Sequence, residues 1–424
     1  MSNLSKPEKS WILYDVANSA FTMLISTTIP IFFRSLAEQQ VSEATASGIW
    51  GLATSAAVLI LAVLSPFLGA LADYRGMKKR MFSVFLVLGI VGLLILSFTG
   101  SWISYMLVFV LTRLCYSACN IFYDSMLVDV TSDERMDRVS SYGYALGYIG
   151  SCIPFVIGIL LILVRPFGLS TQTATQISFV ITALWWAALT IPLLKNVQQT
   201  HYLERRENQV KHAFSRVGQT LKKIRQKPVI FYFILAYFCY IDGVYTIISM
   251  ATTYGGEVGI SDTSMILALL LTQFVAFPCA IFAGRLAEKI GTLKVIRISI
   301  LIYCGICIFG YQLDKSWEFW VLAVIVGMAQ GGIQSLSRSF YGRIIPKEES
   351  NEYFGFFDIF GKFATVVGPF LVALVTGFTG RSSFGILSLL VLFAVGGLLL
   401  FLGKGHMKEA ERAAEAARKA AERP

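Results

Sequence analysis

The chain has 424 residues, of which 55% are hydrophobic and 15% are charged. This composition excludes an ordinary soluble globular protein, in which about 25% of residues are charged. Apolar runs of about 20 residues recur along the whole chain, and each is long enough to cross a bilayer as one helix. The chain is therefore divided into membrane spans rather than soluble domains. The formal net charge of +10 suits a nucleic acid, a membrane surface or an acidic partner, and the positions of the charges must decide among them.

In chain order, the apolar runs predict an all-α membrane protein with twelve transmembrane helices, each long enough to cross about 30 Å of hydrocarbon. We expect these helices at residues 12–36, 48–72, 81–99, 103–128, 140–164, 174–194, 229–251, 263–286, 295–312, 318–342, 352–376 and 383–402. The first run contains Asp15 and Asn18 and lacks a small-residue cleavage site. We therefore expect it to stay in the mature protein rather than act as a cleaved signal peptide.

The basic residues predict the orientation. With the N-terminus inside, 29 of the 36 Lys and Arg residues fall in cytoplasmic segments, as the positive-inside rule requires. We therefore expect a multi-pass protein of a bacterial plasma membrane with both termini cytoplasmic, and the positive charge then records topology rather than nucleic-acid binding. The seven cysteines all lie in apolar runs, so we expect them to pack between helices and to hold no metal or cofactor.

An internal repeat divides the chain into two halves. Gly69, Leu71, Ala72, Asp73, Gly76 and Lys79 match Gly284, Leu286, Ala287, Glu288, Gly291 and Lys294 at an offset of 215 residues, which also relates Pro154-Phe155 to Pro369-Phe370. Duplicated six-helix halves are typical of transporters. The predicted divisions are an N-terminal half (1–194), a basic amphipathic linker (195–228), a C-terminal half (229–402) and a tail (403–424). The tail carries Gly405-His406-Met407, which resembles a cloning junction.

The segment GALADYRGMKKR (Gly69 to Arg80) resembles the loop signature of the major facilitator superfamily. WILYDVANSAF (Trp11 to Phe21), RVSSYGYALGYIG (Arg138 to Gly150) and the stretch from Gln334 to Phe370 are similar to one branch, the autophagy-related vacuolar amino-acid effluxer-like permeases and their bacterial relatives. The chain departs from that branch at Asp124 and Asp358, where asparagine is expected. The resemblance implies the major facilitator fold, and it favours export of amino acids.

Polar side chains at helical spacing predict which helices line a pathway. Arg113, Ser117, Asn120 and Asp124 form one stripe, and Gln330, Gln334, Ser337 and Tyr341 form another. Charges inside a bilayer are costly and usually face a cavity or a partner. Our candidate substrate-binding residues are Asn18, Arg113, Asn120, Asp124, Asp242, Gln330, Gln334, Arg338, Asp358 and Lys362. Our candidate proton-coupling residues are Asp242, Asp124 and Asp15, since every histidine falls in a cytoplasmic segment.

These polar residues also have structural alternatives. The stripes can hold the bundle together by interhelical hydrogen bonds, Asp15 can be an anion near a helix N-terminus, and Asp358 and Lys362 can neutralise each other at i, i+4. In the linker, Val210, Phe214, Val217, Leu221 and Ile224 make an apolar face, which we expect to lie on the membrane surface.

The matched loops predict a gate on the cytoplasmic side, because glycines allow close approach and an acid can engage a helix N-terminus of the other half. Our candidate gating residues are Gly69, Asp73, Gly76, Lys79, Arg80, Gly284, Glu288, Gly291 and Lys294. The alternative is that these loops only anchor topology.

We expect a monomeric secondary transporter that moves a small polar or zwitterionic solute by alternating access, with protons as the coupling ion. An amphiphile or lipid flippase and a non-transporting receptor or scaffold are the alternatives. An enzyme is disfavoured because the spans lack histidine, a metal-ligand cluster and a nucleophile-base pair.

Overall fold

The computed structural model describes residues 4–38, 40–204 and 209–421. In these ranges the chain is helical, and its only β pairing is an isolated bridge between Tyr74 and Leu203. Within the same ranges, twelve helical segments are long and apolar enough to cross a membrane. The predicted all-α, twelve-helix architecture is therefore confirmed.

The N-terminal half contains α1 (Lys6–Ser26), α2 (Thr28–Ala37), α3 (Glu43–Ala72), α4 (Met77–Phe98), α5 (Trp102–Ser125), α6 (Leu127–Val130), α7 (Met136–Val164), η1 (Pro166–Gly168) and α8 (Thr171–Asn196). The C-terminal half contains α10 (Pro228–Glu257), α11 (Asp262–Ile290), α12 (Thr292–Tyr311), α13 (Ser316–Ile344), η2 (Lys347–Glu349), α14 (Ser350–Thr379), α15 (Ser382–Ser388) and α16 (Leu390–Leu402). Helix α9 (Gln209–Gln226) belongs to the linker and α17 (Lys404–Ala421) to the tail.

The first helix begins earlier than the hydropathy predicted. Ser5 and Glu8 form a capping box, in which the Glu8 carboxylate accepts from the Ser5 N–H at 2.7 Å and the Ser5 hydroxyl accepts from the Glu8 N–H at 3.3 Å. This cap satisfies two backbone donors, so the polar residues before Trp11 can be helical. The same apolar run is divided at Thr27, whose backbone departs from helical geometry (φ −132°, ψ −78°).

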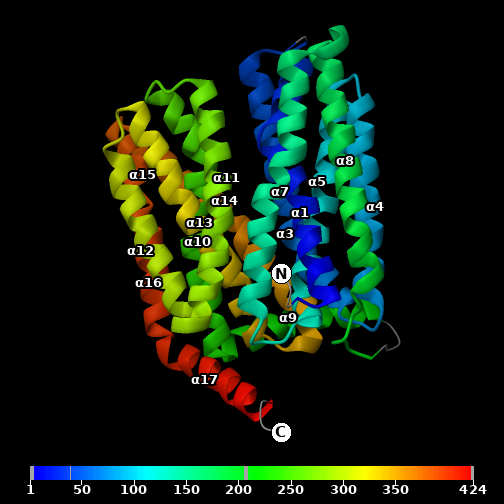
Figure 1. Cartoon of the computed structure of the whole chain (residues 1–424), viewed down its shortest axis with the longest axis vertical. Coiled ribbons are helices and arrows are strands. Elements are labelled where there is room, and N and C mark those ends of the chain that lie inside the picture. The colour runs from blue at the N-terminus through cyan, green and yellow to red at the C-terminus, as the bar shows by residue number, and fades with distance from the viewer. Residues whose placement is uncertain (1–3, 39, 205–208, 422–424) are drawn as a thin grey trace.

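The two halves form separate bundles that lie side by side in Figure 1. Each half has its own apolar core, because one buried cluster contains only residues 224–407 and two others contain only residues 4–197. Helices α4, α8, α12 and α16 lie on the outer sides of the pair (Figure 1), and α4 exposes Val84, Val87 and Leu88 by more than half. These outer helices present apolar side chains where lipid is expected.

The start of α1, the linker helix α9 and α17 lie at one end of the molecule (Figure 1), which we call the α9 end. Helix α9 turns part of its apolar face toward the protein, since Ile224 is 3% exposed and the ring of Phe214 packs against that of Phe67, with centroids 4.4 Å apart. Leu221 stays exposed, and the side chain of Val210 lies outside the described residues. In α17, Met407 is fully buried in the core of the C-terminal half.

Candidate functional site

Glycines bring the two halves together at the α9 end. A Cβ on Gly69 of α3 would overlap the backbone carbonyl of Asn351 at the start of α14. A Cβ on Gly284 of α11 would lie 2.7 Å from the Cβ of Ser141 in α7. The two glycines are related by the 215-residue offset, so the same close crossing of helices occurs twice.

Asp73 joins α3 and α14 at the first of these crossings. Its carboxylate, which is fully buried, accepts hydrogen bonds from the Asn351 backbone N–H (2.8 Å) and side-chain amide (3.0 Å), so a negative charge lies at the N-terminus of α14. Arg216 of α9 contacts both Asp73 (3.0 Å) and Glu352 of α14. Burial raises the pKa of Asp73 from 3.8 to about 6, against the lowering effect of Arg216 and Asn351.

The second crossing is closed by different pairs. Glu288 of α11 accepts two hydrogen bonds from the guanidinium of Arg138 in α7, each of 2.8 Å. Asp137 of α7 pairs with Arg343 of α13 through two contacts of 3.0 Å and accepts from the Thr292 hydroxyl at 2.7 Å. Asp137 is buried while Arg138 is exposed by about 40%, so the Asp137 pair lies deeper than the Glu288 pair.

The other candidate gating residues lie around these contacts. Gly76 has a φ of +74° and donates to Gln199 at 2.9 Å, Lys79 donates to the Val197 carbonyl at 3.0 Å, and Gly291 has a φ of +96°. Arg80 and Lys294 are exposed. These residues shape the loops, and their interactions stay within one half or in the linker.

Above the gate, Arg338 of α13 is enclosed by the N-terminal half. Its guanidinium donates to Asp124 (2.9 Å) and Asp15 (3.0 Å), and it lies over the rings of Tyr144 and Trp11, 4.3 and 4.6 Å from their centroids. Arg338 is 2% exposed. Three predicted site residues from different helices therefore form one buried cluster of two anions and one cation, which we call the Arg338 cluster.

Five of the remaining candidate residues occupy three further places. Asn18 donates to Asn120 at 3.0 Å between α1 and α5, and Tyr148 of α7 donates to Gln334 of α13 at 2.9 Å. Lys362 pairs with Asp358 one turn away on α14, and Asp358 accepts from Ser65 of α3 at 2.8 Å. Each of these is also the hydrogen bond or ion pair that a purely structural role requires.

Asp242 and Arg113 are not brought together. Asp242 of α10 is fully buried, and its Oδ1 accepts from the Gly368 backbone N–H of α14 at 2.9 Å, inside the C-terminal half. Its Oδ2 has no hydrogen-bond partner among the described residues. Arg113 of α5 is half-buried in the N-terminal half and takes no part in these contacts.

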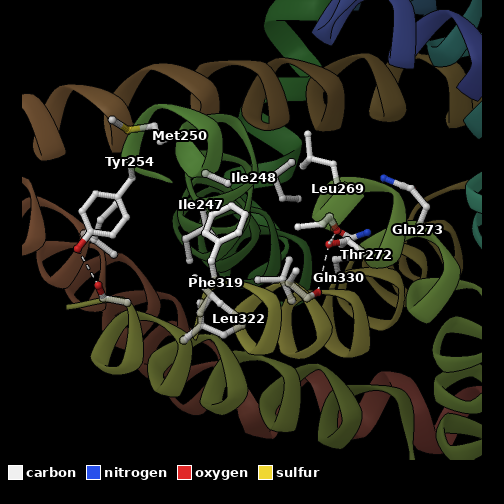
Figure 2. A pocket seen from close by; sticks show the side chains of 17 residues that line it. Ile247, Ile248, Met250, Tyr254, Leu269, Thr272, Gln273, Phe319, Leu322 and Gln330 are labelled. Carbon is white, nitrogen blue, oxygen red and sulfur yellow. Dashed lines mark hydrogen bonds between the residues drawn. The ribbon is translucent and has the colours of Figure 1, made fainter. Parts of the chain in front are cut away.

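A pocket with mostly apolar walls lies inside the C-terminal half between α10, α11 and α13. Figure 2 shows Met250 and Tyr254 at one end of it and Thr272, Gln273 and Gln330 at the other. Gln330 is therefore a pocket residue, 3% exposed, and it lies one turn from Gln334, which binds the other half.

All hydrogen bonds and ion pairs that join the two halves within the described ranges lie toward the α9 end. The one farthest from that end is the bond between Tyr148 and Gln334, and Tyr148 lies 12 residues after Met136, the first residue of α7. At 1.5 Å per residue this depth is about 18 Å. The halves are thus closed at the α9 end, and between described residues no hydrogen bond or ion pair joins them beyond the depth of Tyr148.

The family model for proteins described as "Vacuole effluxer Atg22 like" matches residues 42–414. The chain belongs to the Atg22-like family. It is 43% identical over 407 residues to a Bacillus subtilis protein described as the uncharacterized MFS-type transporter YxiO, covering 94% of this chain and 95% of that protein. It is 29% identical over 295 residues to autophagy-related protein 22 of Cryptococcus neoformans. That match covers 64% of this chain but 53% of the fungal protein, so the Atg22-like chain spans about half of such relatives.

Solved structures place the Atg22-like chain in the major facilitator fold. The proton:xylose symporter XylE superposes with a TM-score of 0.69 over 93% of this chain and 94% of XylE, at 11% identity. The human organic anion transporter MFSD10 gives 0.69 over 93% and 99%, at 13% identity. FucP in its outward conformation gives 0.66 over 94% and 97%, at 14% identity. The relatives and neighbours are transporters, so this Atg22-like protein is a transporter of the major facilitator superfamily and not an enzyme.

Sequence reasoning missed four gate residues of this Atg22-like chain. Arg343, Arg216 and Lys78 were counted only among the cytoplasmic basic residues, and Asp137 was not singled out. Lys78 is 1% exposed and contacts Asp129 and Ser350. One signal was available, because Asp137 and Glu352 are separated by the same 215 residues as the matched loops. Nothing in the sequence indicated that Arg216 reaches both halves.

Proposed function

We propose that the chain moves a small polar solute with a carboxylate, of the amino-acid or short-peptide class, across the membrane by alternating access coupled to protons. The observation that carries this proposal is the Arg338 cluster, in which a cation of one half is held by two anions of the other. Such a contact must break whenever the halves separate at the α9 end.

The closed α9 end corresponds to an outward-facing state if that end is cytoplasmic. The distribution of basic residues favours this orientation, since the linker and the loops at the α9 end hold most of them. Both termini are then cytoplasmic, and the two crossings form the inner gate. Conversion to the inward-facing state requires the Arg338 cluster, the Asp137–Arg343 pair and the Arg138–Glu288 pair to separate.

Protonation can compensate for the positive charge that the Arg338 cluster loses when Arg338 moves away. When Arg338 leaves with the C-terminal half, Asp15 and Asp124 stay on the N-terminal half without their cation. A buried carboxylate is stable only if it is paired or protonated. Protonation of these two groups from the cytoplasm therefore favours the inward-facing state, and their deprotonation allows Arg338 to return. Asp242, a buried carboxylate without a cation among the described contacts, is the second candidate proton site.

The test is solute flux in proteoliposomes with an imposed pH gradient, over a panel of amino acids, short peptides and a labelled lipid. We expect Asp124→Asn to keep solute exchange, which needs no gradient, and to lose accumulation driven by the gradient. Glu257→Gln, at an exposed position at the end of α10, is the matched control and keeps both. Gradient-driven accumulation that persists in Asp15→Asn, Asp124→Asn and Asp242→Asn refutes proton coupling, and flux of the lipid alone favours the flippase alternative.

By analogy with the Atg22-like effluxers, we propose export from the cytoplasm of a bacterial cell as the direction, and a monomer as the working unit. The direction is measured in the same vesicles by comparing the two orientations of the pH gradient.

A further inference from the structure

Among the described residues, Arg113 has no charged or hydrogen-bonding partner. Among the residues that the structure describes, its guanidinium forms no hydrogen bond or ion pair, although it lies within α5 and is half-buried. A charge in the interior of a membrane protein requires a counter-charge or water. The other cation of the central helices that faces the same region, Lys362, is already paired with Asp358. Arg113 is therefore available to a group from outside the chain.

A second cation faces Arg113 from the other half. Arg113 precedes the last residue of α5, Ser125, by 12 residues, and Lys362 follows the first residue of α14, Ser350, by 12 residues. Both helices reach the α9 end at these residues, and α5 contacts α14, so the two cations lie at the same depth, about 18 Å from that end. They are close enough for their like charges to interact. Because Lys362 is itself paired with Asp358, Arg113 is the cation of this pair that is left to attract an anion.

Three of the four aspartates of the central helices are paired with a cation. The four aspartates of α1, α5, α10 and α14 are Asp15, Asp124, Asp242 and Asp358. Arg338 holds the first two and Lys362 holds the last, while Asp242 is fully buried against Gly368. Among these four aspartates only Asp242 lacks a cation, and because it is fully buried inside the C-terminal half it is not accessible to the ammonium group of a zwitterion bound at Arg113. The charges of the site are complementary to an anion.

The pocket of the C-terminal half lies next to this charged region. On α10, Tyr245 lies near Asp358 and Tyr116, and Tyr116 follows Arg113 by three residues on the same side of α5. Ile248 follows Tyr245 by three residues, on the same side of the helix, and lines the pocket. Figure 2 shows Ile247, Ile248, Phe319 and Leu322 forming the apolar wall beyond the polar end of the pocket.

We propose that the transported solute is an amphipathic organic anion, with its carboxylate at Arg113, its apolar body in the pocket of the C-terminal half, and no requirement for an amino group. This inference rests on the proposed transport function and names the part of the solute that the site recognises. The carboxylate would bind the N-terminal half and the apolar part the C-terminal half. The contacts of the solute would therefore differ between the two conformations of the transporter.

Binding to the purified full-length protein tests the inference with four compounds. 3-Phenylpropionate, phenylalanine and 3-phenylpropanamide share one skeleton and differ in charge, and propionate lacks the apolar body. We expect 3-phenylpropionate to bind at least as tightly as phenylalanine, and the amide and propionate to bind at least about tenfold more weakly. This difference follows from the loss of a hydrogen bond between charged groups or of apolar contact.

Variants assign the binding to the residues. Arg113→Gln is expected to weaken 3-phenylpropionate about 10- to 100-fold and to leave the amide unchanged, with Arg113→Lys intermediate. Arg381→Gln, at an exposed position at the opposite end, is the matched control and changes neither. Ile248→Trp, which narrows the pocket, weakens 3-phenylpropionate and leaves propionate unchanged.

The outcomes separate this inference from the transport proposal. Phenylalanine that binds and is transported while 3-phenylpropionate is not bound overturns the inference and leaves the proposed function intact. Equal affinity of the wild-type protein and Arg113→Gln for 3-phenylpropionate also overturns it. Binding of 3-phenylpropionate that depends on Arg113, together with no gradient-driven flux of any solute, supports the anion site and refutes the proposed function.

Discussion

Gly69 offers the sharpest test of the closed α9 end. An alanine Cβ at this position would lie 2.7 Å from the backbone carbon of Asn351 and 2.9 Å from the Cα of Glu352, where ordinary contacts exceed about 3.4 Å. Backbone atoms cannot rotate away, so α3 and α14 must separate in the closed state. Overpacking of this kind costs about 1–3 kcal/mol, which lowers the ratio of closed to open molecules about 5- to 150-fold. The open state has no such contact and bears no cost.

Gly51 provides the control on the same helix. Nothing lies within 4 Å of a Cβ built there, so Gly51→Ala gains the same helix propensity, about 1 kcal/mol, without the clash. Spin labels at residues 171 and 314, on exposed positions of the two halves at the end opposite α9, report closure of that end as a shorter distance in pulsed electron resonance. We expect Gly69→Ala to increase the short-distance population and Gly51→Ala to leave it unchanged. Identical distributions for the two variants would show that the α3–α14 contact does not hold the gate shut.

Two further predictions use the same distance measurement. Because burial raises the pKa of Asp73 to about 6 in the closed state, that state binds a proton at Asp73 more tightly than one in which Asp73 meets water. Protonation of Asp73 between pH 7 and 5 should therefore favour the closed state, opposite to the effect of protonating Asp15 and Asp124. The neighbouring Arg216 and Lys78 keep their charges over this range, but Glu352 also faces Asp73 and can take up a proton. The contribution of Asp73 is therefore the part of the pH response that is present in the wild type and absent in Asp73→Asn. Glu288→Arg should reduce the closed population about fivefold, as expected for a half-exposed pair worth about 1 kcal/mol, and Arg138→Glu in the same chain should restore it.

The sequence was most informative where a physical requirement leaves a local pattern. A bilayer requires about 20 apolar residues per helix, so the twelve spans could be read directly, and duplication placed Gly69 and Gly284 at corresponding positions. Helix ends were less accessible, since the capping box at Ser5 and Glu8 extends α1 into a polar segment that hydropathy ignores.

Pairing between distant residues could not be read from one sequence. Spacing on α5 and α13 identified Arg113, Asp124 and Arg338 as polar positions. Only the three-dimensional arrangement shows that Arg338 forms ion pairs with both Asp15 and Asp124. The same holds for Asp242, whose neighbour is the backbone of Gly368. Partners more than 100 residues away are chosen by tertiary packing, which leaves no periodic signal.

One side chain of the linker helix contacts acidic residues of both halves at the gate. Arg216 contacts Asp73 of one half and Glu352 of the other, so these three positions form one electrostatic unit although they are drawn from separate parts of the chain. Loss of Arg216 leaves two buried carboxylates without their shared cation, whereas loss of one carboxylate leaves Arg216 with a single partner. Across related sequences, positions 73, 216 and 352 should therefore change together, and a linker exchanged between relatives should function only when its arginine is carried over with it.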